Sequence, residues 1–275
     1  MELIAAAETS PRMNAPSTST PLRTVVLAAG KGTRMKSDLP KVMHPAVGRP
    51  MVEWVVDAAF EAGSEEVILV IGHGAELVRG HFARHPNASR IRFAMQERQL
   101  GTGHAVDMAR GFLEGRAGDT LVLCGDGPLI RPQTLATLLA THRARSAAAT
   151  LATSVIPDPT GYGRIERAAD GSFLRIVEQK DATPAQLALR EVNPSYYCFR
   201  TGDLLAALGR LDNKNANGEY YLTDTFEWLR NRGDTVAVVD AVPPEDILSV
   251  NTPEQLAEVD AILRRRGSAR SGGSR

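Results

Sequence analysis

The sequence predicts an α/β fold, in which a mixed, mainly parallel sheet is flanked by helices as in a Rossmann fold, with a small additional lobe. Two observations predict it. Over the first half of the chain, apolar runs of strand length alternate with helical patterns, and small residues or glycines follow most of these runs. After about residue 155 the pattern changes to short alternating segments joined by tight turns, which is typical of hairpins.

The composition is that of a globular protein without a strong overall charge. The chain has 275 residues, with 32 basic and 32 acidic side chains and a formal net charge of zero. A balanced charge gives no general attraction to nucleic acid or to a membrane surface. No apolar run approaches the roughly 20 residues that span a bilayer, and the N-terminus lacks the regions of a secretion signal. We therefore expect a cytoplasmic protein with no nucleic-acid or membrane partner.

The ends of the chain indicate the limits of the folded domain, and the two cysteines indicate its redox environment. Residues 1–22 are rich in Ala, Ser, Thr and Pro and are expected to form a disordered extension, and residues 267–275 a flexible tail. This leaves one folded domain at 23–266. Cys124 and Cys198 lie far apart without metal-ligand spacing, which is typical of a reducing compartment, and a disulfide between them is the alternative.

The segment from Val25 to Lys41 organises the first half of the chain. An apolar run of strand type ends in a loop of small residues, which leave backbone N–H groups open to phosphate oxygens. Positive charge is concentrated in and just after this loop. The small residues are Ala28, Ala29, Gly30 and Gly32, and the cations are Lys31, Arg34 and Lys41.

Two familiar glycine motifs do not fit this loop. A dinucleotide-binding fingerprint requires a third glycine where Met35 stands, and a Walker A loop ends in Gly-Lys-Ser or Gly-Lys-Thr. The pattern Leu-Ala-Ala-Gly-x-Gly-Thr-Arg-Met, followed by Pro40-Lys41, instead resembles the sugar nucleotidyltransferases, which join a nucleoside triphosphate to a sugar 1-phosphate. The resemblance implies a nucleotide-diphospho-sugar transferase fold.

The next elements keep a βαβ rhythm, which places ligands at the carboxyl ends of parallel strands. Pro50 is expected as the first residue of a helix that ends near Gly63, and a second helix is expected from about Ala75. Further helices are expected near Pro132 and over 203–208. Strands are expected at 25–27, 67–71, 92–95, 120–124, 150–155 and 236–239.

Polar residues follow the third and fourth of these strands. The amide of Gln96 can donate and accept at once, as the edge of uracil requires, and Gly101 allows close backbone approach. Asp126, between two glycines, is well placed to hold magnesium on triphosphate oxygens. The alternatives are an ordinary polar residue at a strand end for Gln96 and a turn-capping residue for Asp126.

The run from Gln96 to Ala105 narrows the resemblance to the uridylyltransferase half of the bacterial N-acetylglucosamine-1-phosphate enzymes. It implies that Gln96, Gly101 and Thr102 hold the uridine, with the loop residues Leu27, Ala28, Ala29, Gly30, Gly32 and Lys41 also in the nucleotide site. The nucleotide-binding part would occupy about 23–155.

The second lobe, about 156–250, is implied to hold the sugar. The motifs Tyr-Gly-Arg, Ile-Val-Glu and Glu-Val-Asn match those of the family. The resemblance implies that Gly163, Glu178 and Asn193, together with Gly125, bind the sugar. Taken alone, each of these residues could be an ordinary residue of a protein surface. The run Gly-Glu-Tyr-Tyr-Leu-Thr-Asp at 218–224 is expected to lead into a helix beside the sugar.

The metal site is implied to join two distant residues. Thr252 is a plausible N-cap with Pro253 at the first helical position. Asn251, just before them, resembles the family residue that completes the Mg²⁺ site with Asp126, and a turn asparagine is the alternative.

Three departures from the family pattern are visible. Cys124 stands where relatives usually carry an aromatic residue, and Asn193 is followed by Pro194-Ser195 rather than Thr-Gly or Ser-Gly, so that proline could reshape the pocket. No hexapeptide repeat of a left-handed β-helix is present. We therefore expect neither acetyltransferase activity nor the trimer that such a domain builds.

The resemblance predicts a Mg²⁺-dependent uridylyltransferase that converts UTP and N-acetylglucosamine 1-phosphate into UDP-N-acetylglucosamine and pyrophosphate. The catalytic residues would be Arg34, Lys41 and Asp126. The alternatives are the same chemistry on another sugar 1-phosphate, such as glucose 1-phosphate, or with dTTP, and a non-catalytic module that binds nucleotide sugars. A dehydrogenase is disfavoured by the missing third glycine and by the lack of a ribose-binding acid.

Overall fold

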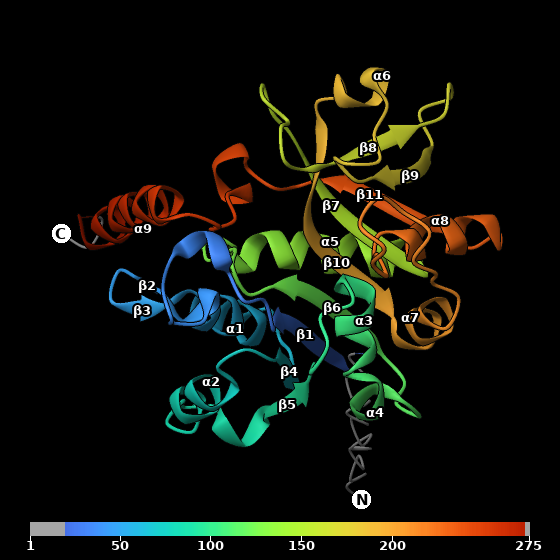
Figure 1. Cartoon of the computed structure of the whole chain (residues 1–275). Coiled ribbons are helices and arrows are strands. Elements are labelled where there is room, and N and C mark those ends of the chain that lie inside the picture. Colours follow the sequence, from blue (N-terminus) through green and yellow to red (C-terminus); the bar gives the residue numbers. More distant parts are fainter. Residues whose placement is uncertain (1–19, 273–275) are drawn as a thin grey trace, which may run out of the picture.

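The computed structural model of the protein describes residues 20–272 (Figure 1). Most of the expected N-terminal extension therefore lies outside the described residues. Leu22, which we assigned to the extension, already begins the first strand, β1, because its backbone is part of the sheet and its side chain is buried.

Within residues 20–272, the main element is one mixed sheet of nine strands. In spatial order, its main path is β11 (Val236–Asp240), β7 (Ala149–Val155), β10 (Glu191–Arg200), β6 (Asp119–Cys124), β1 (Leu22–Ala28), β4 (Glu66–Ile71) and β5 (Ile91–Met95). Strands β6, β1, β4 and β5 are parallel, and β11 is parallel to β7, whereas β10 is antiparallel to both of its neighbours. The expected mixed, mainly parallel sheet is confirmed.

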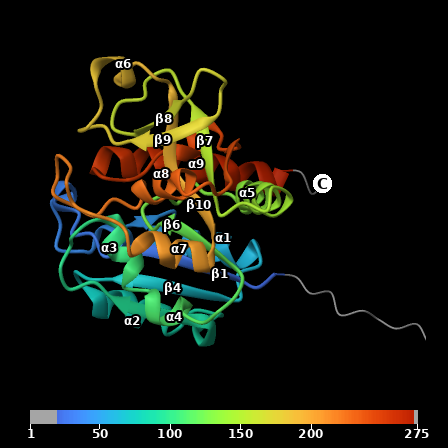
Figure 2. The same cartoon turned by 90° about the vertical axis from the view of Figure 1, so that its right-hand side faces the viewer.

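Helices cover both faces of this sheet (Figures 1 and 2). Adjacent side chains on a strand point to opposite faces, so Ile68 and Leu69 belong to two different core clusters. One cluster includes residues of α1 (Met51–Glu61), α2 (Ala75–Phe82) and α5 (Pro132–Ala144). The other includes residues of α3 (Thr102–Asp107), α4 (Arg110–Leu113), α7 (Thr201–Leu208) and α8 (Asp224–Asn231).

The expected second lobe is a hairpin on the end of β10. Strands β8 (Gly163–Arg167) and β9 (Phe173–Val177) pair antiparallel, and Asn193 of β10 pairs with Gly163. Figure 2 shows the short α6 (Pro184–Leu187) at the top of the molecule, with the hairpin below it, beside β7 and above β10. A single strand, β10, thus reaches from the centre of the sheet into the lobe.

The start of α1 and the end of α9 differ from the expectation. Pro50 is extended (φ −52°, ψ 139°) and pairs within the small sheet of β2 (Pro45–Ala46) and β3 (Arg49–Pro50), so α1 begins one residue later. The C-terminal helix α9 (Pro253–Gly272) includes residues 267–272, where we expected a flexible tail. The side-chain hydroxyl of Ser268 donates to the carbonyl of Arg264 one helical turn earlier. Residues 273–275 lie outside the described part.

Among the described residues there are also four short 3₁₀ helices: η1 (Thr33–Met35), η2 (Lys41–Met43), η3 (Ala88–Arg90) and η4 (Pro244–Ile247). A third core cluster joins α9 to the start of α1 and to the loop after β1, through Val259, Met51 and Met35. Within residues 20–272, no helix is both long enough and apolar enough to cross a membrane.

Candidate active site

A cavity of about 270 Å³ opens at the carboxyl ends of β1 and β6. This nucleotide pocket brings together most of the residues that were assigned to the nucleotide. Its lining is Leu27, Ala29, Gly30, Lys41, Val42, Gln96, Gln99, Gly101, Thr102, Ala105, Cys124, Asp126 and Glu219. Ala28 is not in the lining, because it is the last residue of β1 and is buried in the core.

The loop after β1 bends back over η2. Gly32 has φ 63°, and a Cβ atom there would lie only 2.4 Å from the Cβ of Lys41. A glycine is therefore needed for Lys41 to pass beneath the loop. Arg34 lies in η1 and is exposed.

Four predicted residues meet in a cation cluster, which consists of Arg34, Lys41, Asp126 and Asn251. The Nζ atom of Lys41 donates to a carboxylate oxygen of Asp126 and to Oδ1 of Asn251 at 3.1 Å. Nη2 of Arg34 donates to the same Asn251 oxygen at 3.0 Å. The N–H of Val250 donates to the Asp126 carbonyl at 2.9 Å, which brings Asn251 to the end of β6.

The oxygens of this cluster suit a hard divalent cation. The side chains of Asp126 and Asn251 already hold the ammonium group of Lys41 between them. Carboxylate and amide oxygens are ligands that Mg²⁺ accepts, and Mg²⁺ usually takes one or two carboxylates together with phosphate oxygens and water. In the part of the chain that the structure describes, no three His, Cys, Asp or Glu side chains form a metal-binding group. Phosphates of the substrates would therefore have to supply further ligands.

The base end of the nucleotide pocket is fixed by hydrogen bonds. Gln96 is only 4% exposed, and its Nε2 donates to the carbonyl of Gly101 at 3.3 Å and lies 3.0 Å from Nδ1 of His104. The side-chain carbonyl oxygen of Gln96 therefore stays available to accept a hydrogen bond from a nucleotide base. Gln99, which we did not assign, donates to the Ala29 carbonyl at 2.6 Å and lines the pocket. Gln99 stands in the same sequence motif as Gln96, so the motif could have indicated that it lines the pocket.

Gly101 and Thr102 hold the motif at 218–224 against the pocket. Gly101 has φ 113°, and a Cβ atom there would lie 2.5 Å from the Tyr220 carbonyl oxygen. Oγ1 of Thr102 accepts from the N–H of Leu222 at 3.0 Å. These contacts place the start of α8 beside the pocket, and its first residue, Asp224, confirms the expected helix.

A second cavity, of about 280 Å³, lies between the cation cluster and the lobe. This sugar pocket contains three of the four residues assigned to the sugar. Its lining is Arg34, Thr160, Gly161, Tyr162, Gly163, Glu178, Asn193, Pro194, Ser195, Ser249, Asn251 and Gln255. Gly125 lines neither pocket: its N–H donates to the Leu27 carbonyl at 2.9 Å, and the space at its Cα faces Val52.

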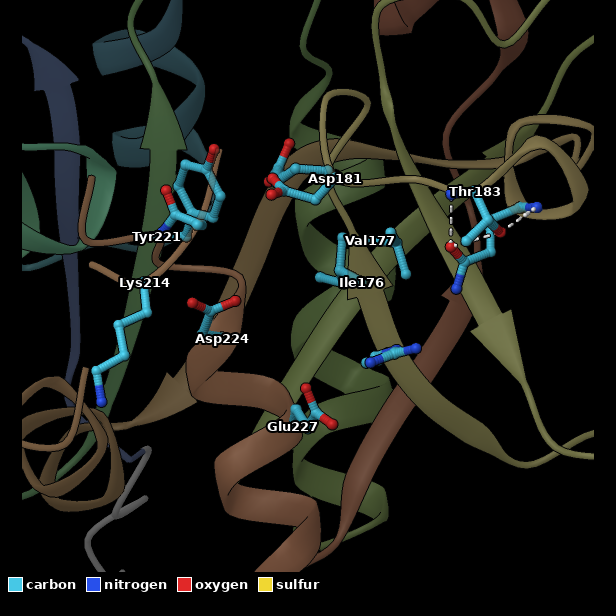
Figure 3. Close-up of a pocket in the computed structure, with 12 residues that line it drawn as sticks. Ile176, Val177, Asp181, Thr183, Lys214, Tyr221, Asp224 and Glu227 are labelled. Atoms are coloured by element: carbon cyan, nitrogen blue, oxygen red, sulfur yellow. Dashed lines mark hydrogen bonds between the residues drawn. The ribbon is translucent and has the colours of Figure 1, made fainter. Parts of the chain in front are cut away.

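Glu178 lines both the sugar pocket and a third hollow of about 360 Å³. Its Oε1 accepts from Oγ1 of Thr223 at 3.0 Å, a contact that sequence reasoning missed, and burial raises its pKa. Figure 3 shows Asp224 and Glu227 on α8 facing Asp181 across this hollow. Burial and the neighbouring carboxylates raise the pKa of Asp224 to about 6.

Asn193 is held from within the protein. Its Nδ2 donates to the Tyr197 hydroxyl at 2.7 Å, and its Oδ1 accepts from the N–H of Ser195 at 3.0 Å. The pairing of β10 with β7 shifts register between Val192 and Tyr196. This irregularity turns the backbone after Asn193 into the sugar pocket.

Comparison with known proteins agrees with this geometry. A family model described as nucleotidyl transferase matches residues 23–242. The bifunctional protein GlmU of Geobacter metallireducens is 49% identical over 245 residues, which cover 89% of this chain and 51% of that protein. The bifunctional protein GlmU of Brevibacillus brevis is 46% identical over 254 residues, which cover 91% and 54%. The chain thus spans about half the length of the curated relatives it matches.

Solved structures share the fold at low sequence identity. UDP-glucose pyrophosphorylase complexed with UDP-glucose has a TM-score of 0.72 and 19% identity, with 90% of this chain and 99% of that chain covered. The apo form of a UDP-glucose pyrophosphorylase has a TM-score of 0.73 and 17% identity over the same shares. The expected nucleotide-diphospho-sugar transferase fold is confirmed, and with the family model matching most of its length, the chain is a member of the nucleotidyl transferase family.

Proposed function

We propose that the protein is a Mg²⁺-dependent uridylyltransferase that makes UDP-N-acetylglucosamine and pyrophosphate from UTP and N-acetylglucosamine 1-phosphate. The position of the cation cluster carries this proposal. Lys41 and Asp126 line the nucleotide pocket, and Arg34 and Asn251 line the sugar pocket. The charges therefore lie at the junction where a nucleotide phosphate and a sugar phosphate would meet.

The choice of substrates is supported by the sequence motifs. Gln96, Gly101 and Thr102, which the family resemblance assigns to uridine, line the nucleotide pocket, and Gly163, Glu178 and Asn193 line the sugar pocket. The relatives named GlmU match over nearly the whole chain.

The reaction requires positioning and charge neutralisation rather than a general base. A phosphate monoester is largely ionised near neutral pH, so an oxygen of the sugar phosphate can attack the α-phosphorus of UTP directly. The bond from that phosphorus to the bridging oxygen breaks, and pyrophosphate leaves. The N–H groups of the loop and Arg34 would hold the triphosphate, and Lys41 would offset charge at the α-phosphorus. Mg²⁺ on Asp126 and Asn251 would neutralise charge on the phosphates.

The test is pyrophosphate release from UTP and N-acetylglucosamine 1-phosphate with Mg²⁺, beside an EDTA control. Lys41→Ala and Asp126→Asn should each lower kcat by about 100-fold or more, since each removes a charge from the reacting centre. Asp38→Asn is the matched control, because Asp38 is exposed in the same loop and lines none of the three pockets described above. A near-normal rate in either of the first two variants would contradict the assignment.

The alternatives are separated by the same assay. Glucose 1-phosphate replaces N-acetylglucosamine 1-phosphate in one assay, and dTTP replaces UTP in another. The pair with the highest kcat/KM identifies the physiological substrates. A non-catalytic module would bind UTP in a calorimeter but release no pyrophosphate with any pair.

A further inference from the structure

Ser195 has an unusual backbone conformation for a serine. Its φ is 67°, in the left-handed region that residues other than glycine rarely adopt. Within residues 20–272, three other non-glycine residues have positive φ, namely Lys36, Val47 and Ser146, and none of these lines the sugar pocket. Such strain persists only where the surroundings enforce it, and it is concentrated at functional sites.

A directed chain of hydrogen bonds ends at the Ser195 hydroxyl. Nδ2 of Asn193 can only donate, and it donates to the Tyr197 hydroxyl at 2.7 Å. The Tyr197 proton is then directed to Oγ of Ser195 at 3.3 Å. Exchanging the positions of Oδ1 and Nδ2 in the Asn193 amide would break a hydrogen bond, because Oδ1 accepts from the Ser195 N–H.

The proton of the Ser195 hydroxyl is left for a partner outside this chain of bonds. Asn193 and Tyr197 are both buried, at 6% and 3% exposure, while Ser195 is half-buried at the pocket wall. The Ser195 hydroxyl forms a hydrogen bond with the Cys124 side chain, but a thiol is a weak acceptor, so a carbonyl oxygen in the sugar pocket would displace it. Ser195 therefore presents a hydrogen-bond donor to the sugar pocket.

Ser195 also lines a small cavity next to the sugar pocket. The cavity has a volume of about 40 Å³, a few times the roughly 10–15 Å³ that one water-sized group needs. Its walls are mainly apolar and come from both halves of the molecule: Leu27, Val122, Leu123 and Leu222, with Thr102, Cys124, Glu178, Ser195, Tyr197 and Thr223. A donor at the mouth of a small apolar cavity suits a short acyl group, whose carbonyl accepts and whose methyl is buried.

We propose that Ser195 is a specificity-determining residue, whose hydroxyl donates to the carbonyl oxygen of an N-acyl group on the sugar 1-phosphate while the acyl methyl enters the small cavity. This inference rests on the proposed function. It assigns the choice between an acylated and an unacylated sugar to a residue that family motifs did not assign.

Ser195→Ala removes the hydroxyl and keeps the Cβ atom. The variant should lower kcat/KM for N-acetylglucosamine 1-phosphate by about threefold to tenfold, as expected for one neutral hydrogen bond, through KM rather than kcat. The value for glucose 1-phosphate, which has no acyl carbonyl, should stay within twofold, and so should KM for UTP. Equal losses for both sugars, or no loss for either, would overturn the proposal.

Ser195→Gly separates the hydroxyl from the strained backbone. It should show the same loss of selectivity as Ser195→Ala but a higher Tm, because glycine adopts a positive φ without strain. Ser146→Gly is the matched control: Ser146 has φ 46° and is exposed after α5, so its Tm should rise with unchanged kinetics. A selectivity change in Ser195→Gly without one in Ser195→Ala would assign the effect to the backbone and overturn the role of the hydroxyl.

Failure of the proposed function would be recognised separately. If the wild-type protein releases no pyrophosphate with any pair, calorimetry with UDP-N-acetylglucosamine and UDP-glucose still tests Ser195. The ratio of the two affinities should fall about threefold to tenfold in Ser195→Ala. An unchanged ratio, or no binding of either nucleotide sugar to the wild type, would overturn the inference about Ser195.

Discussion

Lys41 occupies the position between Asp126 and Asn251 that the proposed mechanism assigns to a divalent cation. Its Nζ donates to both of their side chains, so a metal that uses these oxygens has to displace it. Lys41→Met should therefore bind Mn²⁺ more tightly than the wild type when no nucleotide is present, although turnover is lost. Electron paramagnetic resonance of free Mn²⁺ measures this affinity.

The control for that measurement is Lys36→Met. Lys36 is exposed and follows η1, and it is not part of the cation cluster, so its removal changes the local charge by the same amount without freeing Asp126. Equal Mn²⁺ affinity in Lys41→Met and Lys36→Met would show that general charge, rather than displacement, governs binding of the metal.

Charged and amide side chains that stand in sequence motifs were the ones that sequence reasoning placed best. Arg34, Lys41, Asp126 and Asn251 were assigned from three separate segments, and the structure brings them together. The roles of Thr223 and Ser195 depend on contacts across the chain and on a backbone angle, and neither quantity is encoded by residue type or spacing. Gly125 lines neither pocket for the same reason, since its environment is set by packing of β6 on β1.

At the scale of elements, η4 links α9 to the active site. Asp246 in η4 is 1% exposed and accepts hydrogen bonds from Arg131 and from Arg266 of α9. Its carbonyl accepts from the Tyr196 hydroxyl at 3.0 Å. Asn251 lies four residues after the end of η4, so this ion network helps to fix where that residue lies.

Asp246→Asn should destabilise the fold by about 2 kcal/mol, less than the 3–5 kcal/mol of a fully buried pair, because both arginines are partly exposed. The free energy of unfolding is measured by urea denaturation. Glu245→Gln is the control, since Glu245 contacts the same two arginines from an exposed position, and its removal should cost less than about 0.5 kcal/mol. Similar losses in the two variants would show that burial of Asp246 contributes nothing.

Elements were predictable where apolar periodicity was strong. The parallel strands and the helices α1, α2 and α5 follow from it, as does the hairpin of β8 and β9. The end of α9 could not be predicted in this way, because residues 267–272 are Gly, Ser and Arg with a single Ala and form no apolar face. The start of α1 was misplaced for a related reason: Pro50 fits the first turn of a helix, but it also fits the extended pairing with Pro45.

At the scale of the whole molecule, β10 joins the two parts that we propose bind the nucleotide and the sugar. It pairs with β6, which carries Asp126 at its end, and its far end pairs with β8, which begins at Gly163. Side chains from both parts also share one core cluster, in which Val25 and Phe226 pack together with Ile165. Two regions that the sequence motifs separate are therefore continuous in the sheet and in the core.

This continuity predicts that the two parts unfold together. A calorimetric scan should show one transition, and UDP-N-acetylglucosamine at 100 times its Kd should raise its Tm by about 5–10 °C, because binding at that concentration contributes about 2.7 kcal/mol. UMP, which reaches only the nucleotide pocket, should move the same single transition at equal saturation. If the scan instead shows two transitions and UMP moves only one of them, the parts are independent domains, and the sheet that joins them does not make their unfolding cooperative.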